Sequence, residues 1–280
     1  MSIITISRGS YNRGKEVAEK VAADLGYKCI SRDILLDASK EFNIPEIRLI
    51  RALHDAPSVL ERFTHGKERY LSYIRKALLQ HIQKDNIVYH GLAGHFFLLN
   101  IPGVLKVRIT ADMEERVKEE AKRENISKEK ALYILKKDDE ERRKWGLGVY
   151  GIDTWDSRLY DMVFHIKNLT VENAAELICQ TVQKPHFKTT PESQKILNDS
   201  LLAAKVHAAI VTISPKIIVA ANDGIVNIGT AEIPLDVRND ISDKIKSAAE
   251  KVEEVKEVIL TMHKKTDNHH SVNPFHNIDR

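Results

Sequence analysis

The chain has 280 residues, 42% of them hydrophobic, which is more than one typical domain needs and enough for sizeable cores. Its 43 basic and 40 acidic side chains leave a formal net charge of only +3. This balance excludes the strong overall field that would point to nucleic acid or an anionic membrane as a partner. We therefore expect two domains and no nucleic-acid partner.

The cysteines and the first residues indicate a reducing compartment. Cys29 and Cys179 are the only cysteines and lie far apart, which suits free thiols better than a disulfide framework. The residues after Met1 lack the regions of a signal peptide, and no run is long enough to span a bilayer. We expect a soluble, cytoplasmic protein without a transmembrane segment.

The N-terminal stretch runs from an apolar strand, residues 3–7, into a turn with the pattern G-x-x-x-x-G-K. Such a turn before a helix can bind phosphate through backbone N–H groups and the helix N-terminus, while the lysine adds a point charge. The alternative is an ordinary strand-to-helix turn. The candidate nucleotide-binding residues are Gly9, Ser10, Tyr11, Asn12, Arg13, Gly14, Lys15 and Glu16.

The helix and strand that follow favour phosphate binding. Val17, Val21 and Leu25 form one apolar stripe, and Gly26 ends this helix as a C-cap. A second strand, residues 27–30, follows at once. The order strand, loop, helix, strand is that of a βαβ unit, whose phosphate-binding crevice opens at the carboxyl ends of its strands. The expected fold class is α/β, with a parallel sheet flanked by helices.

Several motifs follow one another along roughly the first 180 residues. They are Ile4-Thr5-Ile6-Ser7-Arg8, Gly14-Lys15-Glu16, Leu25-Gly26-Tyr27, residues 31–35, residues 102–109, residues 111–117, Lys137-x-Asp139-x-x-Arg142, Asp153-x-Trp155-Asp156 and residues 160–164. Together they resemble the cytidylate kinase-like branch of the nucleoside monophosphate kinases. The resemblance implies a P-loop NTPase-type domain over residues 1–182.

The resemblance also implies an activity: ATP-dependent phosphoryl transfer to a nucleoside monophosphate, above all CMP or a related pyrimidine nucleotide, with ATP and Mg²⁺ as cofactors. Lys15 and Arg142 are then the candidate catalytic residues, one on the donor phosphates and one on the transition-state charge. The implied substrate-binding residues are Arg32, Asp33, Lys137 and Asp139.

Two positions depart from the usual patterns. Glu16 stands where a Ser or Thr hydroxyl usually meets Mg²⁺, so the metal ligand is unknown; Glu16 could hold the ion through water. Gly91-Leu92 follows the predicted strand 86–90 where the family usually has Gly-Arg. An arginine there would grip a phosphate in bidentate fashion. The alternative hypothesis is therefore a nucleotide-binding regulator that has lost turnover.

Two helical regions are expected to cover the substrates. Residues 35–84 correspond to the acceptor-binding lobe, and their basic residues either line an anion pocket or are surface charges of amphipathic helices. The charged segment 112–144 is a solvated helix or, over 136–158, part of a lid whose glycines form a hinge or a plain loop. The basic residues of the first region are Arg48, Arg51, Arg62, Lys67, Arg69 and Arg75.

The sequence changes character near residue 183. Residues 183–195 are polar and contain two prolines, which predicts a linker. The order αββαβ is expected over residues 196–263, with a hairpin turn at Asn222-Asp223-Gly224. This small α+β unit resembles a BON domain, which implies docking to a protein or membrane surface, or self-association. The tail, residues 264–280, is expected to be disordered, and its histidines are assigned no metal site.

Overall fold

The computed structural model describes residues 2–9, 13–54, 66–91, 93–215, 217–230 and 238–262. Ser10, Tyr11 and Asn12 of the predicted phosphate-binding turn lie outside these ranges. So do Arg62, Leu92 and the predicted tail, residues 264–280.

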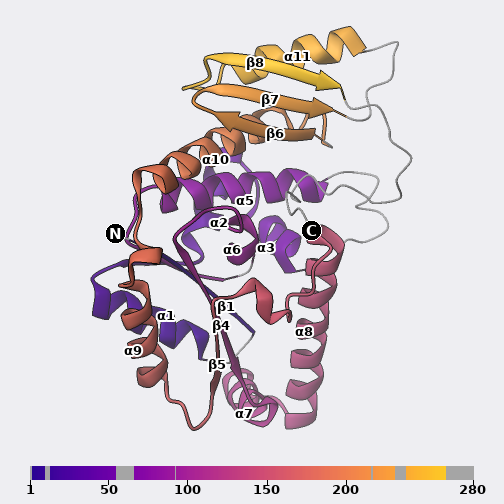
Figure 1. The fold of residues 1–280 in the computed structure, drawn as a ribbon. Coiled ribbons are helices and arrows are strands. Elements are labelled where there is room, and N and C mark those ends of the chain that lie inside the picture. The colour runs from indigo at the N-terminus through magenta and orange to yellow at the C-terminus, as the bar shows by residue number, and fades with distance from the viewer. Residues whose placement is uncertain are drawn as a thin grey trace.

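A parallel sheet with the strand order β2-β3-β1-β4-β5 forms the centre of the N-terminal part (Figure 1). We call this the large sheet. β1 pairs with both β3 and β4, and its Ile4 and Ile6 are fully buried, which explains why its sequence is a nearly continuous apolar run. The strands are β1 (Ile3–Arg8), β2 (Lys28–Ile30), β3 (Ile87–His90), β4 (Val104–Ala111) and β5 (Met162–Ile166).

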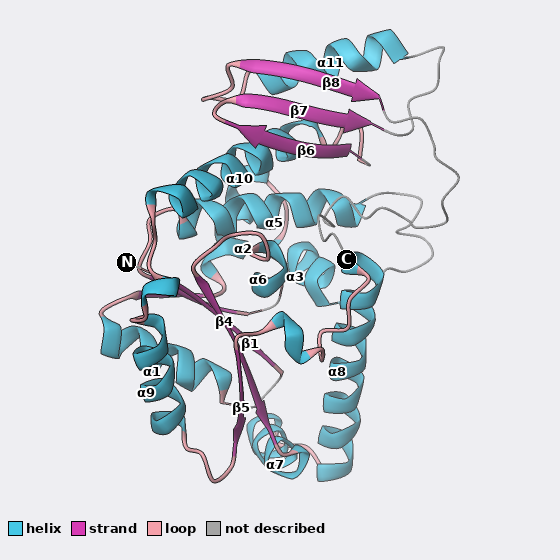
Figure 2. Ribbon diagram, in the orientation of Figure 1, coloured by secondary structure: helices cyan, strands magenta, loops and turns pink. Residues whose placement is uncertain are grey.

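Helices cover both faces of the large sheet, as predicted (Figure 2). α1 (Gly14–Leu25) and α9 (Val171–Val182) share one core, to which the predicted stripe contributes Val17 and Val21. Gly26 ends α1 in the left-handed conformation, with φ 68°. The helices on the other face are α2 (Asp33–Phe42), α3 (Glu46–His54), α5 (Gly66–Ile82) and α6 (Gly94–Phe97).

The charged segment is two helices rather than the single helix expected from its sequence. α7 (Met113–Glu124) ends at Asn125, whose φ of 52° is left-handed, and Ser127 caps α8 (Lys128–Tyr150) by accepting from the N–H of Lys130. Asn125 thus ends α7, and Ser127, two residues later, begins α8. The helical segment is therefore interrupted at this point.

The glycines of the predicted lid do not form a flexible loop. Gly146 and Gly148 lie inside α8, and Gly151 ends it with φ 68°. A Cβ on Gly146 would lie 2.6 Å from Cγ2 of Thr154, so this glycine lets the following loop pack closely on the helix. The expectation of a plain loop is therefore wrong for Gly146 and Gly148, whereas a hinge at this segment stays a prediction.

The C-terminal part has the predicted αββαβ order. Its three strands form a second, small sheet with the order β6-β7-β8, in which Asp223 (φ 53°) and Gly224 (φ 90°) make the predicted hairpin turn. β8 lies parallel to β7 after the crossover through α11. The elements are α10 (Pro191–Ile210), β6 (Ile217–Asn222), β7 (Ile225–Thr230), α11 (Arg238–Glu250) and β8 (Glu257–Met262).

Helix α10 belongs to two cores at once. Leu197 and Leu201 are buried with α5 in the core of the large sheet, whereas Leu202 and Val206 are buried under the small sheet. α10 begins at Pro191, inside the predicted linker, after a short 3-10 turn at Pro185–Phe187. The predicted domain limits remain predictions, but this helix physically joins the two sheets.

None of the helices in the described ranges is both long enough and apolar enough to cross a bilayer.

Adjacent leucines of α10 provide a test of this double role. We predict that Leu201→Ala and Leu202→Ala each lower the free energy of unfolding by roughly 2–5 kcal/mol, because each removes a fully buried side chain. Amide hydrogen exchange should distinguish the two variants. Leu201→Ala should speed exchange in α5, and Leu202→Ala should speed it in β6 and β7. Identical exchange maps for the two variants would contradict this assignment.

Candidate functional site

A small cavity of about 40 Å³ lies where β1 and β4 approach helix α8. Its walls come from the end of β1, the chain after β3, the middle of β4, the end of α3, α8 and the loop that follows α8. We call it the arginine pocket. The residues that line it are Ser7, Arg8, Gly9, Leu53, Ala93, His95, Phe96, Arg108, Asp139, Arg142, Trp145, Thr154 and Trp155.

Guanidinium groups dominate the charge of this pocket. Arg8, Arg108 and Arg142 are the arginines among its described lining residues. Burial lowers the pKa of Arg142, and the neighbouring Arg8 acts in the same direction. Cations held close together in a partly dry site attract an anion, and planar guanidinium groups suit phosphate and carboxylate oxygens.

The acidic residue of the pocket is already neutralised. Asp139 accepts two hydrogen bonds from Arg116, at 2.7 and 2.9 Å, in a largely buried pair that ties α7 to α8. Asp138 and Asp139 also act on Arg142, where their charge favours the protonated guanidinium and so acts to raise its pKa. Among the described lining residues, three arginines thus stand beside one carboxylate, which is paired with Arg116.

The position of Arg8 depends on Gly14. A Cβ on Gly14 would lie 2.5 Å from Cβ and 2.8 Å from Cδ of Arg8, which is closer than real side chains pack. The second glycine of the G-x-x-x-x-G-K pattern is thus required by the contact between the start of α1 and the Arg8 side chain. This contact leads Arg8 toward the pocket.

The backbone after β3 is held in an unusual conformation. Ala93 has a φ of 63°, in the left-handed region that a residue with a Cβ rarely adopts. A Cβ on Gly94 would lie 2.4 Å from the Tyr89 ring and 2.6 Å from Oγ1 of Thr5. α6 therefore packs directly on β1 and β3, and His95 and Phe96 consequently reach the pocket.

His95 is a neutral imidazole at physiological pH. Its side chain is only 3% exposed, and burial, followed by the nearby Arg108 and Lys106, lowers its pKa to about 3. Nε2 lies 3.4 Å from the Tyr160 hydroxyl, and Nδ1 has no hydrogen-bond partner among the described residues. His95 can therefore donate or accept one hydrogen bond without adding charge.

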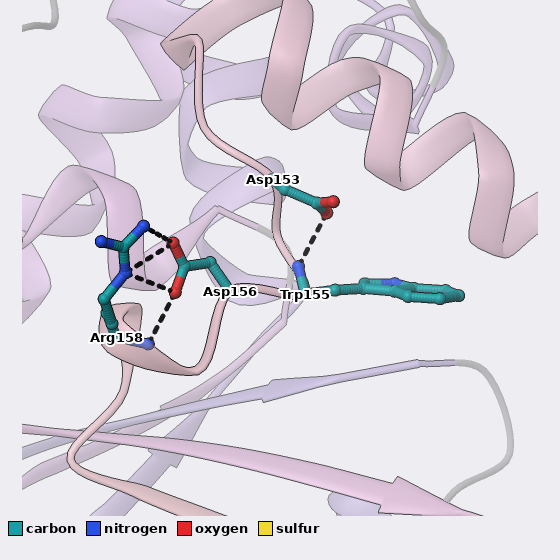
Figure 3. A network of polar contacts seen from close by, with 4 residues as sticks. All are labelled: Asp153, Trp155, Asp156 and Arg158. Atoms are coloured by element: carbon teal, nitrogen blue, oxygen red, sulfur yellow. Dashed lines mark hydrogen bonds and ion pairs between the residues drawn. The ribbon is translucent and has the colours of Figure 1, made fainter.

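The loop after α8 covers the pocket and fixes Arg108. The Thr154 carbonyl accepts from Nη1 of Arg108 at 2.8 Å and from the Tyr160 hydroxyl at 3.0 Å. Figure 3 shows that Asp153 accepts from the Trp155 backbone, that Asp156 pairs with Arg158, and that the Trp155 ring extends away from this pair. The loop thus carries its own polar framework.

Trp145 closes the pocket from α8. Its indole N–H donates to the Ala52 carbonyl at 2.8 Å, which anchors α8 to the end of α3. Phe96 and Tyr150 stack beside it with ring centroids 4.1 Å apart. These buried rings give the pocket an apolar wall that keeps water out.

The predicted nucleotide-binding turn lies near the pocket, at the start of α1. Arg13 takes a left-handed conformation (φ 62°), and its side chain makes no capping hydrogen bond to the first turn of α1. The Arg13 guanidinium lies 3.8 Å from Glu16 and 4.0 Å from Glu119 of α7. Lys15 is 63% exposed, and its Nζ lies 3.6 Å from Glu19.

Other predicted site residues lie outside the lining of the pocket. Arg32 is 71% exposed and bonds Glu46 through two nitrogens, at 2.5 and 2.7 Å, and this bond lowers the pKa of Glu46. Asp33 accepts from the backbone of Ser31 at 3.3 Å, and Lys137 is on the exposed face of α8. Of the predicted residues within the described ranges, the pocket brings together Gly9, Asp139 and Arg142.

Arg8 and Arg108 were noticed only as parts of motifs, and His95 was not singled out from the sequence. A usable signal exists for the two arginines, because each is a cation in a strand that is otherwise largely buried. The parallel register places Ser7 beside Arg108, so the end of β1 lies next to the middle of β4. No comparable signal marks His95, which depends on the left-handed turn at Ala93.

The fold and the site together define an α/β protein with an arginine-lined pocket beside its central parallel strands. Residues 3–168 match the cytidylate kinase-like family, and the chain belongs to that family.

Several known proteins are similar to this chain. A cytidylate kinase of Sulfolobus acidocaldarius is 25% identical over 184 residues, which cover 65% of this chain and 95% of the relative. A cytidylate kinase of Ignicoccus hospitalis is 26% identical over 180 residues, covering 64% of this chain and 97% of the relative. An uncharacterized protein of Eubacterium ventriosum has a similar solved structure, with a TM-score of 0.50, 19% identity, and coverage of 66% of this chain and 99% of its own.

Gly14 and Gly26, at the two ends of α1, allow a test of what holds Arg8 in position. We predict that Gly14→Ala displaces Arg8 and weakens the binding of inorganic pyrophosphate about tenfold or more, since a charge-assisted contact contributes about 1.5–3 kcal/mol. Gly26→Ala is the control, because its Cβ meets nothing within 4 Å and only its left-handed backbone is strained. It should lower stability by roughly 1 kcal/mol and leave pyrophosphate affinity unchanged. Equal affinities for the wild type and Gly14→Ala in calorimetry would contradict the prediction.

Buried histidines make the folded protein less stable as the pH falls. The folded-state pKa of His95 is about 3, below the ordinary value of 6.5, so the folded protein binds fewer protons than the unfolded chain between these pH values. The contribution of His95 to the free energy of unfolding is fully present above pH 6.5. It falls as the pH is lowered, by roughly 2 kcal/mol at pH 5.

His90 and His207, whose pKa values are lowered to about 4, act in the same direction. Urea unfolding of His95→Gln should therefore show a shallower loss of stability from pH 7 to 5 than the wild type. The exposed His186 provides the control, and His186→Gln should follow the wild-type curve. If the free energy of unfolding of His95→Gln falls with pH as steeply as that of the wild type, His95 is not a buried, neutral group in the folded protein.

Proposed function

We propose that the protein transfers a phosphoryl group from ATP to a nucleoside monophosphate, with CMP or a related pyrimidine nucleotide as the acceptor. The observation that carries the proposal is the convergence of Arg8, Arg108 and Arg142 on one pocket beside the start of α1. Phosphoryl transfer depends mainly on aligning two substrates and neutralising the charge on the moving group. A site built almost entirely of guanidinium groups and apolar walls meets those needs.

The donor is assigned to the start of α1. In this proposal the residues Gly9 to Glu16 surround the outer phosphates of ATP with backbone N–H groups, and Lys15 adds its ammonium charge. The left-handed Arg13 and the uncapped first turn of α1 support this placement. Lys15 lies over its own helix in the described conformation, so binding would exchange its weak contact with Glu19 for a phosphate.

The arginine pocket is assigned to the phosphoryl group in transit. Arg8 and Arg108 come from neighbouring strands and are fixed by packing, whereas Arg142 comes from α8, which serves as the lid. Donors that are already in position when charge develops lower the barrier without further reorganisation. Trp145 and Phe96 exclude water, which would otherwise compete as an acceptor.

The acceptor nucleotide is assigned to the side formed by α2 and α8. Arg32 and Asp33 are at the start of α2, and Lys137 and Asp139 lie one turn before Arg142. Because Arg32 is bound to Glu46 and Asp139 to Arg116, both residues would orient the acceptor from within existing ion pairs. The phosphate oxygen of the acceptor is itself anionic, so the reaction needs no general base from the protein.

Magnesium fits this site as a partner of the nucleotide rather than of a preformed cage. The described residues contain no group of three His, Cys, Asp or Glu side chains placed to hold a metal ion. Mg²⁺ in such sites is bound mainly by substrate phosphates, waters and one or two carboxylates, and Glu16 is the carboxylate at the start of α1. When bound, the ion would bridge and partly neutralise the donor phosphates.

The choice of CMP rests on relatives. Both curated relatives named above are cytidylate kinases that align over nearly their whole length with about two thirds of this chain. The alternative is a regulator that binds nucleotide without turnover, which is favoured by Gly91-Leu92 where the family usually has Gly-Arg. ADP formation measured across a panel of nucleoside monophosphates separates the two, with Lys15→Ala as a control for turnover.

We predict that Arg142→Met lowers kcat/KM for the preferred monophosphate by about 100-fold or more, because it removes a preorganised cation from the transition state. Lys136→Met on the exposed face of the same helix should have wild-type kinetics. The measurement is a coupled ADP assay, with circular dichroism to confirm folding. Equal losses in both variants, or none in Arg142→Met, would refute the assigned role.

We also propose that the small sheet is a BON-like docking module. This rests on the αββαβ order and on the sequence resemblance. On the face of the sheet away from α10 and α11, Ile225 and Ile259 are more than a third exposed. Docking of a protein partner, or of a second copy, is the role we assign to this face.

A further inference from the structure

A second and larger cavity, of about 280 Å³, lies between the two sheets. α5, α6 and the residues after α6 form one side, α10 forms another, and the edge strand β6 closes the third. We call it the intersheet cavity. Its lining residues are Arg75, Phe96, Phe97, Leu99, Asn100, Ile101, Tyr150, Ile196, Asp199, Ser200, Ala203, Ile218, Val219, Ala220 and Ala221.

One cation faces this cavity from α5. Arg75 is surrounded by protein, and burial lowers its pKa. The nearby Tyr150 acts in the opposite direction and favours the charged guanidinium. The carboxylate of the cavity, Asp199, is engaged elsewhere: it lies 3.3 Å from Lys195 and accepts from the Asp223 backbone at 2.9 Å. A guanidinium beside a carboxylate that is already paired can bind the acidic group of a ligand.

The rest of the cavity suits a flat apolar body. Phe96, Phe97 and Tyr150 line it from the side of the large sheet, and aliphatic side chains line it from β6 and α10. Asn100 and Ser200 supply a few polar groups beside these walls. A cavity that combines apolar and aromatic walls with a few charged and hydrogen-bonding groups is a common form of a small-molecule site.

The intersheet cavity shares a wall with the arginine pocket. Phe96 lines both, and it stacks on Tyr150 with an interplanar angle of 3°. A ligand that moves this stacked pair in one cavity changes the space available in the other. The two sites would then be linked reciprocally, because each ligand changes the affinity for the other by the same factor.

We propose that the intersheet cavity binds a small organic anion with a flat apolar body, which Arg75 holds by its acidic group, and that its occupancy is transmitted to the arginine pocket through Phe96. The binding half is independent of the proposed kinase activity. The transmission half rests on the proposed function, since it requires that the arginine pocket binds phosphate.

The test of binding uses the full chain and the probe 8-anilinonaphthalene-1-sulfonate, an aromatic anion that fluoresces in apolar sites. The wild type should bind one equivalent. Arg75→Met should weaken this binding tenfold or more, while Lys84→Met, which removes an exposed cation just beyond α5, should not change it. Loosened proteins bind more of this probe, so a loss of signal in Arg75→Met cannot result from misfolding.

A second variant acts from the opposite wall. Ser200→Trp introduces an indole on the α10 wall of the cavity while Arg75 is kept, and it should also abolish the stoichiometric binding. The proposal is overturned if the wild type shows no saturable binding, or if Arg75→Met and Ser200→Trp both bind the probe as the wild type does.

Transmission is measured as the change in pyrophosphate affinity when the probe is saturating. We expect a shift of several-fold in the wild type and none in Ser200→Trp. An unchanged affinity in the wild type overturns transmission. A protein that binds the probe but never binds pyrophosphate contradicts the proposed function and the transmission, while the intersheet site stands on its own result.

Discussion

The site depends on bringing arginines from three separate elements together. Arg8, Arg108 and Arg142 line one cavity of about 40 Å³, where burial and Arg8 act to lower the pKa of Arg142 and the neighbouring Asp138 and Asp139 act to raise it. Other contacts hold these arginines in place: the packing of Gly14 on Arg8, the Thr154 carbonyl on Arg108, and the Arg116–Asp139 pair beside Arg142. An anion in the pocket would bring a further opposite charge to these guanidinium groups.

Much of the fold could be predicted, because local patterns determine it. The buried run of β1, the stripe of α1, the cap at Gly26 and the Asp223-Gly224 turn are short-range signals, and the structure contains each of them. The single helix expected over residues 112–144 was wrong, because Asn125 supplies a left-handed stop whose effect outweighs a continuous charge pattern. The plain loop expected at Gly146 and Gly148 was also wrong, because α8 continues through both, and Gly146 packs closely on Thr154.

The site was harder to predict than the fold. The family resemblance predicted Arg142 and Asp139 as site residues, and both line the pocket, but it did not indicate that Arg116 binds Asp139. Arg108 and His95 become neighbours only through the parallel register of β1 with β4 and the strained turn at Ala93, neither of which a single sequence displays. The same limit applies to α10, whose two buried faces serve different sheets and cannot be assigned to them before both sheets exist.

The molecule is a parallel-sheet, kinase-like fold whose arginine pocket is bordered by α8 and which α10 joins to a small sheet. The central claim of the proposed function is that the arginines of this pocket hold a phosphate-like group. The most direct measurement is X-ray diffraction from crystals soaked in tungstate, a heavy analogue of phosphate, with anomalous data. The account predicts a single strong peak within hydrogen-bonding distance of Arg8, Arg108 and Arg142. A pocket without a peak, with tungstate bound only at surface lysines, would contradict it.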